Sequence, residues 1–256
     1  MSTYLWQNFL TDSTIRHRIA DKTQLFFNET KSKNLIEIWP GKWSITKLIL
    51  NITPDFFLFE KDETLKEILE EVLSHKQKWN AKIIRWDVLE WDLDQFKWEK
   101  DKTFVVGNLP YYITSPILRK FFWSGLGEFA GWLFMVQDEV WQKLRFDADK
   151  KSYLYWILNY AYEVKYLKTV PAKAFSPAPK VKSCMIWLFK KEQLPNIPFE
   201  KLISFLDLFS PYSRKTLWKI SKMISKKWGT FVIPEDLQNK RLEELDWNQI
   251  EKICVA

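Results

Sequence analysis

The segment "NLIEIWPGKWSIT", Asn34 to Thr46, joins an apolar run to the start of a helical pattern. In an open α/β sheet, ligands bind beyond the carboxyl ends of the strands, and the first strand-to-helix turn brings the backbone close to the ligand. Glycine suits such a turn because it lacks a Cβ atom and adopts positive φ. Only Gly41 is present, and Trp39 and Trp43 flank it. Alone, this turn fits a ligand site or an ordinary surface loop.

Strand and helix patterns alternate on either side of this turn. Apolar, β-branched runs predict strands at 35–38, 56–59, 83–84, 103–106, 133–136, 164–170 and 185–189. Helical patterns such as Thr64–Leu73 and Ser115–Phe122 lie between most of them. Alternation of this kind predicts an α/β fold with a Rossmann-like, mostly parallel sheet. The last two runs are joined by a Pro-rich loop, so we expect them to form an antiparallel hairpin at the edge of the sheet.

The pattern changes after "KKEQLPNIP", residues 190–198, because only helical patterns follow from Phe199 onward. We therefore expect a large domain over 1–192 and a small all-helical domain over 193–256. The chain has 256 residues, of which 46% are hydrophobic, so it is long enough to bury a full core.

Several classes of protein are disfavoured by composition. No apolar run approaches the roughly 18 residues of a membrane span, and "MSTYLWQNFLTDS" lacks the order of a signal peptide, so we expect a cytoplasmic protein without a membrane partner. Cys184 and Cys254 form no metal-binding spacing, and the two histidines, His17 and His75, lie in helical surroundings rich in lysine. We expect no bound metal.

The charge balance favours a polyanionic partner. The net charge is +7 and the pI is about 9.1. Six lysines or arginines and no acid lie within Ser210–Lys227. A helix face that only solvates the protein is the alternative, but such faces usually alternate in sign.

Tryptophan is abundant where glycine is scarce. Average usage predicts about 18 glycines for this length, yet the chain has 6 Gly and 15 Trp. Trp6, Trp86, Trp132, Trp141 and Trp156 also stand where a turn or a tight contact favours a small residue. We therefore expect crowding at these positions and infer that most tryptophans occupy glycine positions.

The stretch "VVGNLPYYITSPIL", Val105 to Leu118, resembles motif IV of the ribosomal RNA adenine dimethyltransferases of the KsgA type. Four other segments are similar to motifs of this family, in the same order, so that the resemblance covers nearly the whole chain. They are "QNFLTD" (7–12), "MVQDEV" (135–140), "KAFSPAPKVKS" (173–183) and "SRKTL" (213–217). The joint signal of N-L-P-Y and the distant F-x-P-x-P-K-V-x-S is more specific than either motif alone.

The resemblance implies a class I methyltransferase fold with S-adenosylmethionine as the cofactor. Glu60, at the end of the second strand, is then expected to hold the ribose hydroxyls, and Asp87 the adenine amino group beside Val88. Glu37 is expected to orient amides of the turn. The implied cofactor residues are Gln7, Asn8, Leu10, Glu37, Trp39, Gly41, Glu60, Asp87, Val88 and Asn108.

The resemblance also implies how the target base is held. The adenine N6 lone pair is delocalised, so the amino group needs acceptors that favour a pyramidal nitrogen. The Asn108 side-chain oxygen and the Leu109 carbonyl would provide them, and Pro110 would stiffen the segment. Tyr111 and Phe175 would stack on the extruded base; a plain core role remains the alternative for Phe175.

By resemblance, the substrate is a pair of adjacent adenosines in the 3′-terminal hairpin loop of small-subunit (16S) ribosomal RNA, methylated twice each in an immature 30S particle by a monomeric enzyme. Arg214, Lys215, Lys219 and Lys222 are expected to contact RNA phosphates. The alternatives are an erythromycin-resistance enzyme acting on large-subunit RNA, and a non-catalytic RNA-binding assembly factor. A nicotinamide-dependent oxidoreductase would give the N-L-P-Y segment no role.

The tryptophans are the departures from the family. The family pattern at the first turn is E-x-G-x-G-x-G, with Trp39 and Trp43 at its first and third glycines, and Trp6 and Trp86 also stand at glycine positions. We hypothesise that the gene uses UGA as a glycine codon and that it was translated here as Trp. A catalytically dead relative with genuine tryptophans is the alternative.

Overall fold

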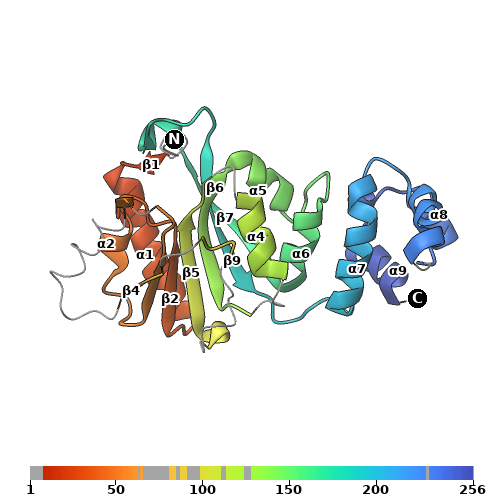
Figure 1. The fold of residues 1–256 in the computed structure, drawn as a ribbon, viewed down its shortest axis with the longest axis horizontal. Helices are drawn as coiled ribbons and strands as arrows, with labels where there is room; N and C mark the ends of the chain where they lie inside the picture. The colour runs from red at the N-terminus through yellow and green to blue at the C-terminus, as the bar shows by residue number, and fades with distance from the viewer. Residues whose placement is uncertain are drawn as a thin grey trace. The chain divides into compact units, whose positions relative to one another are not determined.

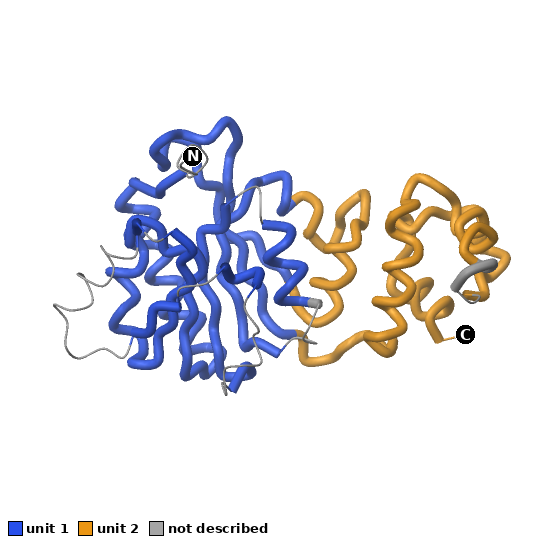
Figure 2. The backbone as a smooth tube through the Cα atoms, in the orientation of Figure 1, with its two compact units in different colours: residues 1–141, 164–190 blue, residues 142–163, 191–256 orange. Residues whose placement is uncertain are grey.

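The computed structural model describes residues 8–62, 64–65, 81–84, 87–90, 99–110, 114–123, 128–228 and 231–255. The backbone forms two compact units: residues 1–141 with 164–190, and residues 142–163 with 191–256 (Figure 2). The second unit therefore contains a segment, 142–163, that precedes our expected boundary at 192/193. The expected boundary between the two domains stays a prediction.

The first unit is built on a seven-stranded sheet with the order β4-β3-β2-β5-β6-β9-β7 (Figure 1). The strands from β4 to β6 are parallel, and β9 runs antiparallel to β6. Their bounds are β2 Asn34–Ile38, β3 Phe56–Phe59, β4 Lys82–Ile84, β5 Thr103–Asn108, β6 Gly131–Gln137, β7 Tyr162–Val170 and β9 Ser183–Lys190. Each of the seven predicted runs falls within one of these strands, and the predicted α/β class is confirmed.

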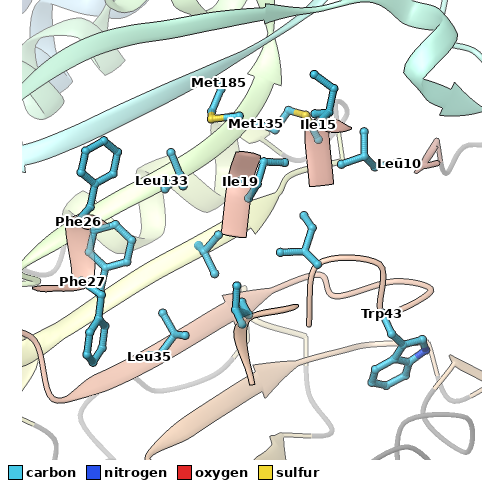
Figure 3. Close-up of a cluster of buried hydrophobic side chains, with 14 of the residues drawn as sticks. Leu10, Ile15, Ile19, Phe26, Phe27, Leu35, Trp43, Leu133, Met135 and Met185 are labelled. Carbon is cyan, nitrogen blue, oxygen red and sulfur yellow. The ribbon is translucent and has the colours of Figure 1, made fainter. Parts of the chain in front are cut away.

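The central strands are apolar on both faces because helices cover the sheet. Helix α1 (Ser13–Glu29) begins at Asp12, whose carboxylate accepts from the Ile15 amide at 3.0 Å. Its buried stripe includes Ile19 and Phe26, which belong to the same core cluster as Leu35 (Figure 3). The shorter helices of this unit are α2 (Thr46–Ile49), α4 (Thr114–Trp123) and α5 (Asp138–Leu144), the last of which crosses the division between the units.

A second, two-stranded sheet was not predicted. Strand β1 (Phe9–Leu10) pairs antiparallel with β8 (Phe175–Ser176), so that Leu10 lies opposite Phe175. The Thr11 amide also donates to the Ala174 carbonyl at 2.8 Å. This pairing fixes the N-terminal segment beside the first strand-to-helix turn, whose Gly41 lies under the Phe9 ring.

The second unit is helical. It contains α6 (Tyr153–Ala161), α7 (Phe199–Phe209), α8 (Leu217–Trp228) and α9 (Trp247–Val255), together with 3₁₀ turns. Helix α7 packs against α8 and α9 through its buried face. Among the described residues from Phe199 onward, all regular structure is helical, as predicted.

Two of the tryptophans expected to crowd their surroundings are accommodated. Trp132 is fully buried in β6, with its ring centroid 4.8 to 5.4 Å from those of four phenylalanines. Trp141 lies 5.5 Å from the Tyr166 ring. An aromatic cluster therefore fills the space that we expected a small residue to occupy. Trp6 and Trp86 lie outside the described residues.

Candidate functional site

The candidate site lies where the strand order of the sheet reverses. Strands β2 and β5 are neighbours in the middle of the sheet. From β2 the chain continues to β3, towards one edge of the sheet, and from β5 it continues to β6, towards the opposite edge. A crevice forms outside the carboxyl ends of the strands at such a switch point. A pocket is found there, lined by Asn8, Phe9, Leu10, Trp39, Pro40, Gly41, Lys42, Ser44, Ile45, Asn108, Leu109 and Pro110.

The turn after β2 forms one wall of this pocket. Trp39, Gly41 and Trp43 have φ angles of 61°, 57° and 65°, which place all three in the left-handed region. The Trp39 amide donates to the Phe59 carbonyl at 3.0 Å, and the Trp43 amide donates to the Pro40 carbonyl at 3.1 Å. These hydrogen bonds hold the turn in its conformation.

Glu60 ties this turn to the end of β3. One carboxylate oxygen accepts from the Gly41 amide at 3.1 Å, and the other accepts from the Asp62 amide at 2.9 Å. The turn contact that we predicted for Glu37 is therefore made by Glu60. The Glu60 side chain is 2% exposed, and its burial raises its pKa above the ordinary value. Ribose binding by Glu60 stays a prediction.

Glu37 is the last acid before the turn and is 1% exposed. Its Oε2 atom has no hydrogen-bond partner within the described part of the chain. Burial raises the pKa of Glu37 to about 8; the Thr46 hydroxyl lowers it and the Glu60 carboxylate raises it to smaller extents. Glu37 is therefore largely protonated at neutral pH.

The other wall of the pocket follows β5. Gly107 lies opposite Ile38, and a Cβ atom at Gly107 would lie 2.9 Å from the Ile38 carbonyl oxygen, so the two strand ends approach closely. The Leu109 amide donates to the Met135 carbonyl at 3.2 Å, and the Thr114 hydroxyl donates to the Pro110 carbonyl at 3.0 Å. Strand β6 and the first turn of α4 thereby fix the segment after Asn108.

Asn108 itself is half-buried and faces the pocket. Its side-chain amide has no hydrogen-bond partner among the residues that the structure describes. An amide oxygen and an amide nitrogen are therefore available to a ligand at this position.

Of the remaining predicted site residues, Asn8 and Leu10 line the pocket, whereas Asp87, Val88 and Phe175 do not. The Asp87 carboxylate is 2.7 Å from the Lys61 ammonium, and Val88 is 1% exposed. Phe175 is 4% exposed and belongs to the core cluster. Gln7 and Tyr111 lie outside the described residues.

Sequence reasoning missed several residues that line the pocket. They are Phe9, Pro40, Lys42, Ser44 and Ile45, and the Lys42 ammonium lies 4.5 Å from the centre of the Phe9 ring. Their position next to the quoted turn and the N-terminal segment was the available signal. The pairing of β1 with β8, which brings Phe9 to the turn, had no signal in the sequence.

The predicted RNA-contacting residues lie in the second unit, around the start of α8. Arg214, Lys215, Lys219 and Lys222 are all exposed. The Lys222 ammonium lies 3.9 Å from the centre of the Trp218 ring. This part of the surface therefore combines positive charge with an exposed aromatic ring, both of which suit a nucleic acid.

Membrane-spanning helices and metal sites were sought in the described part of the chain. No helix in that part is both long and apolar enough to cross a membrane. The same residues contain no group of three or more histidine, cysteine or acidic side chains that would hold a metal ion.

Comparison with known proteins gives consistent results. The model of the "Ribosomal RNA adenine dimethylase" family matches residues 2–252. Proteins named ribosomal RNA small subunit methyltransferase A are similar: that of Streptococcus thermophilus is 34% identical over 225 residues, 83% of this chain and 73% of the relative. That of Levilactobacillus brevis is 36% identical over 224 residues, 84% of this chain and 73% of the relative.

Two solved structures share the fold. A dimethyladenosine transferase from Plasmodium falciparum matches with a TM-score of 0.74 and 21% identity, covering 96% of this chain and 95% of that one. The 23S rRNA methyltransferase ErmE matches with a TM-score of 0.66 and 21% identity, covering 97% and 100%.

The parallel sheet with its antiparallel strand β9, and a pocket at the switch point between β2 and β5, define the fold of a class I methyltransferase. The match to the family model and to curated relatives shows that its cofactor is S-adenosylmethionine. The chain belongs to the ribosomal RNA adenine dimethylase family. It is an rRNA adenine dimethyltransferase.

The pocket suits this cofactor in its chemistry, because Asn108 offers polar atoms and Lys42 and Ser44 add others. The empty space is about 580 Å³ with open solvent included, and pockets for ligands of this size occupy roughly 300–1,000 Å³. Only about 40 Å³ of this space is enclosed enough to be counted as interior, and Trp39 lines it.

Proposed function

We propose that this enzyme dimethylates two adjacent adenosines in the 3′-terminal hairpin loop of small-subunit ribosomal RNA. The proposal is supported by relatives that are named small subunit methyltransferases and are 33–36% identical to the chain. Single-stranded loop bases suit the enzyme because they are unstacked at little cost. We further propose that it acts as a monomer on an immature 30S particle in the cytoplasm.

The observation that carries the proposal is the Asn108 side-chain amide at the carboxyl end of β5, which has no hydrogen-bond partner among the described residues. We propose that the Asn108 side-chain oxygen and the Leu109 carbonyl accept the two hydrogens of the adenine amino group. Pro110 restricts the backbone there, and the Leu109 amide is anchored on β6 at 3.2 Å. Acceptors that are fixed in advance lose little entropy when the base binds, which favours productive alignment.

We propose that Tyr111 stacks on one face of the extruded base and Phe175 on the other. Because Phe175 is 4% exposed, its ring must become more exposed before a base can stack on it. For the cofactor we propose contacts from Gln7, Asn8, Leu10, Glu37, Gly41, Glu60, Asp87, Val88 and Asn108, with residue 39 next to them.

The helical domain, 193–256, is proposed to hold the RNA and the domain over 1–192 to hold the cofactor. Arg214, Lys215, Lys219 and Lys222 are exposed, so a phosphate can reach them from solvent. Each phosphate contact of this kind increases the dependence of binding on salt.

Transfer of a tritiated methyl group to isolated ribosomal subunits tests this function. The protein would carry glycine at positions 39 and 43, where the tryptophans have positive φ. The subunits would come from a strain that lacks dimethyladenosine in its rRNA. We expect label in small subunits, loss of label with Asn108→Ala, and retention with the matched variant Asn34→Ala. Asn34 is suitable because it lies at the amino end of β2, with its side chain 3.3 Å from Thr103.

Label in the large subunit would replace the proposal with an enzyme of the erythromycin-resistance type. RNA binding without transfer to either subunit would replace it with a non-catalytic assembly factor.

A further inference from the structure

Three residues of the turn after β2 share one unusual backbone conformation. Trp39, Gly41 and Trp43 have φ angles of 61°, 57° and 65°, at alternate positions of a single turn. Side chains with a Cβ atom rarely adopt this region, and for a bulky residue it is a genuine outlier. The middle residue is glycine, which adopts this conformation without steric strain.

The strained conformation is imposed from outside the turn. Hydrogen bonds from the Trp39 amide to Phe59 and from the Gly41 amide to Glu60 anchor the turn on the end of β3. The Trp43 amide donates within the turn, to the Pro40 carbonyl at 3.1 Å. The backbone therefore requires three left-handed residues here, whatever side chains they carry.

The two indole side chains occupy the pocket wall and the core. Trp39 lines a pocket that has only about 40 Å³ of enclosed space. Trp43 belongs to the core cluster (Figure 3) and is 2% exposed, and its indole N–H has no hydrogen-bond partner in the described part of the chain. Buried indole N–H groups usually find a partner. Backbone strain is therefore joined by a narrowed pocket at Trp39 and by an unpaired N–H at Trp43.

We infer that the functional protein carries glycine at positions 39 and 43, and that both tryptophans arise from a UGA codon that the source translates as glycine. Glycine at both sites satisfies the φ angles, removes the buried unpaired N–H and opens the pocket. The scarcity of glycine, 6 against 15 tryptophans in the whole chain, points the same way. The inference concerns the residues of the turn and holds whichever RNA is methylated.

The second unit also contains buried indole N–H groups without a hydrogen-bond partner among the described residues. Trp156 of α6 and Trp247 of α9 pack edge to face at 4.9 Å, and neither indole N–H has a partner among the described residues. Trp218 of α8 differs, because it is 41% exposed and lies under the Lys222 ammonium. Trp218 is therefore a matched position at which glycine should have no effect on the pocket.

Two measurements test the inference. The first is the gene sequence: we expect UGA at codons 39 and 43, and UGG at either codon would overturn the inference at that position. The second is calorimetric titration with S-adenosylhomocysteine of the chain as written, Trp39→Gly, Trp39→Gly/Trp43→Gly and Trp218→Gly. We expect the double variant to bind at least about 100-fold more tightly than the chain as written, a large effect on the affinity scale, and Trp218→Gly to bind like the chain as written.

Equal affinity of the chain as written and a folded glycine variant would overturn the steric argument. Trp39→Gly keeps the test valid if loss of the Trp43 indole unfolds the protein, because residue 39 is only half-buried. A glycine variant that binds the ligand but methylates neither subunit would refute the proposed function and leave this inference standing.

Discussion

Replacement of Glu37 by glutamine should remove a large pH dependence of stability. The folded-state pKa of Glu37 is about 8, against an ordinary value of 4.5, chiefly because the carboxyl group is buried. Between these two pH values the folded protein holds a proton that the unfolded chain releases, so stability falls as pH rises. Each pKa unit is worth about 1.4 kcal/mol, so the total effect is on the order of 5 kcal/mol.

The raised pKa of Glu37 determines the direction in which the free energy of unfolding changes with pH. The contribution is fully present below pH 4.5 and is lost as pH rises through about 8. Urea unfolding between pH 5 and 8.5, followed by near-UV circular dichroism, should show a fall of about 1.4 kcal/mol per pH unit in the chain as written. Glu37→Gln, which stays neutral at this position, should show a flatter profile; a slope of the same sign remains because burial also raises the pKa of Glu60.

Glu99→Gln is the matched control. Its side chain is 56% exposed and forms a surface ion pair with Lys33 at 3.0 Å, so its loss should change stability by less than about 1 kcal/mol. A slope that is as steep in Glu37→Gln as in the chain as written, or a stability that rises between pH 5 and 8, would refute the assignment of a buried, protonated Glu37.

Three further changes have defined outcomes. Gly107→Ala places a Cβ atom 2.9 Å from a carbonyl oxygen of β2, so urea unfolding should show a loss of about 1–3 kcal/mol. Asn108→Ala should lower the methyl-transfer rate of the glycine variant by about 10²-fold or more without lowering its Tm, because the amide has no partner among the described residues; an unchanged rate would exclude the proposed role. Arg214→Glu with Lys219→Glu should weaken RNA binding and reduce the slope of log affinity against log salt by about two, and an unchanged slope in a filter-binding series would place the RNA elsewhere.

The sheet was predictable because its signals are local. The runs at Leu35–Ile38 and Phe56–Phe59 are short, apolar and flanked by turn residues, which is typical of strands buried on both faces. The site at the carboxyl ends of β2 and β5 followed from the position of the turn and of the N-L-P segment. The β1–β8 ribbon was not predictable, because a strand of two residues leaves no periodic signal. The two strands are also far apart in the sequence: the adjoining residues Thr11 and Ala174, which are hydrogen-bonded, are 163 positions apart.

The electrostatics of the turn show the limit of sequence reasoning more clearly. Glu37 is the last residue but one of β2 and Glu60 directly follows β3, and nothing in the sequence states which of them accepts from the Gly41 amide. Register decides it: β2 and β3 pair so that Ile38 lies opposite Phe59, and Glu60 then reaches the turn at 3.1 Å. Glu37 is left buried with an unpaired oxygen in the described region. Burial of this kind depends on the assembled sheet.

The central claim is most directly tested by mapping the product on the RNA. Small subunits that lack dimethyladenosine would be incubated with S-adenosylmethionine and the Trp39→Gly/Trp43→Gly protein, and nuclease fragments of their rRNA would be analysed by mass spectrometry. We predict that two adjacent adenosines of the 3′-terminal hairpin loop each gain two methyl groups. An unmodified hairpin, with methyl groups at any other adenosine, would contradict the account.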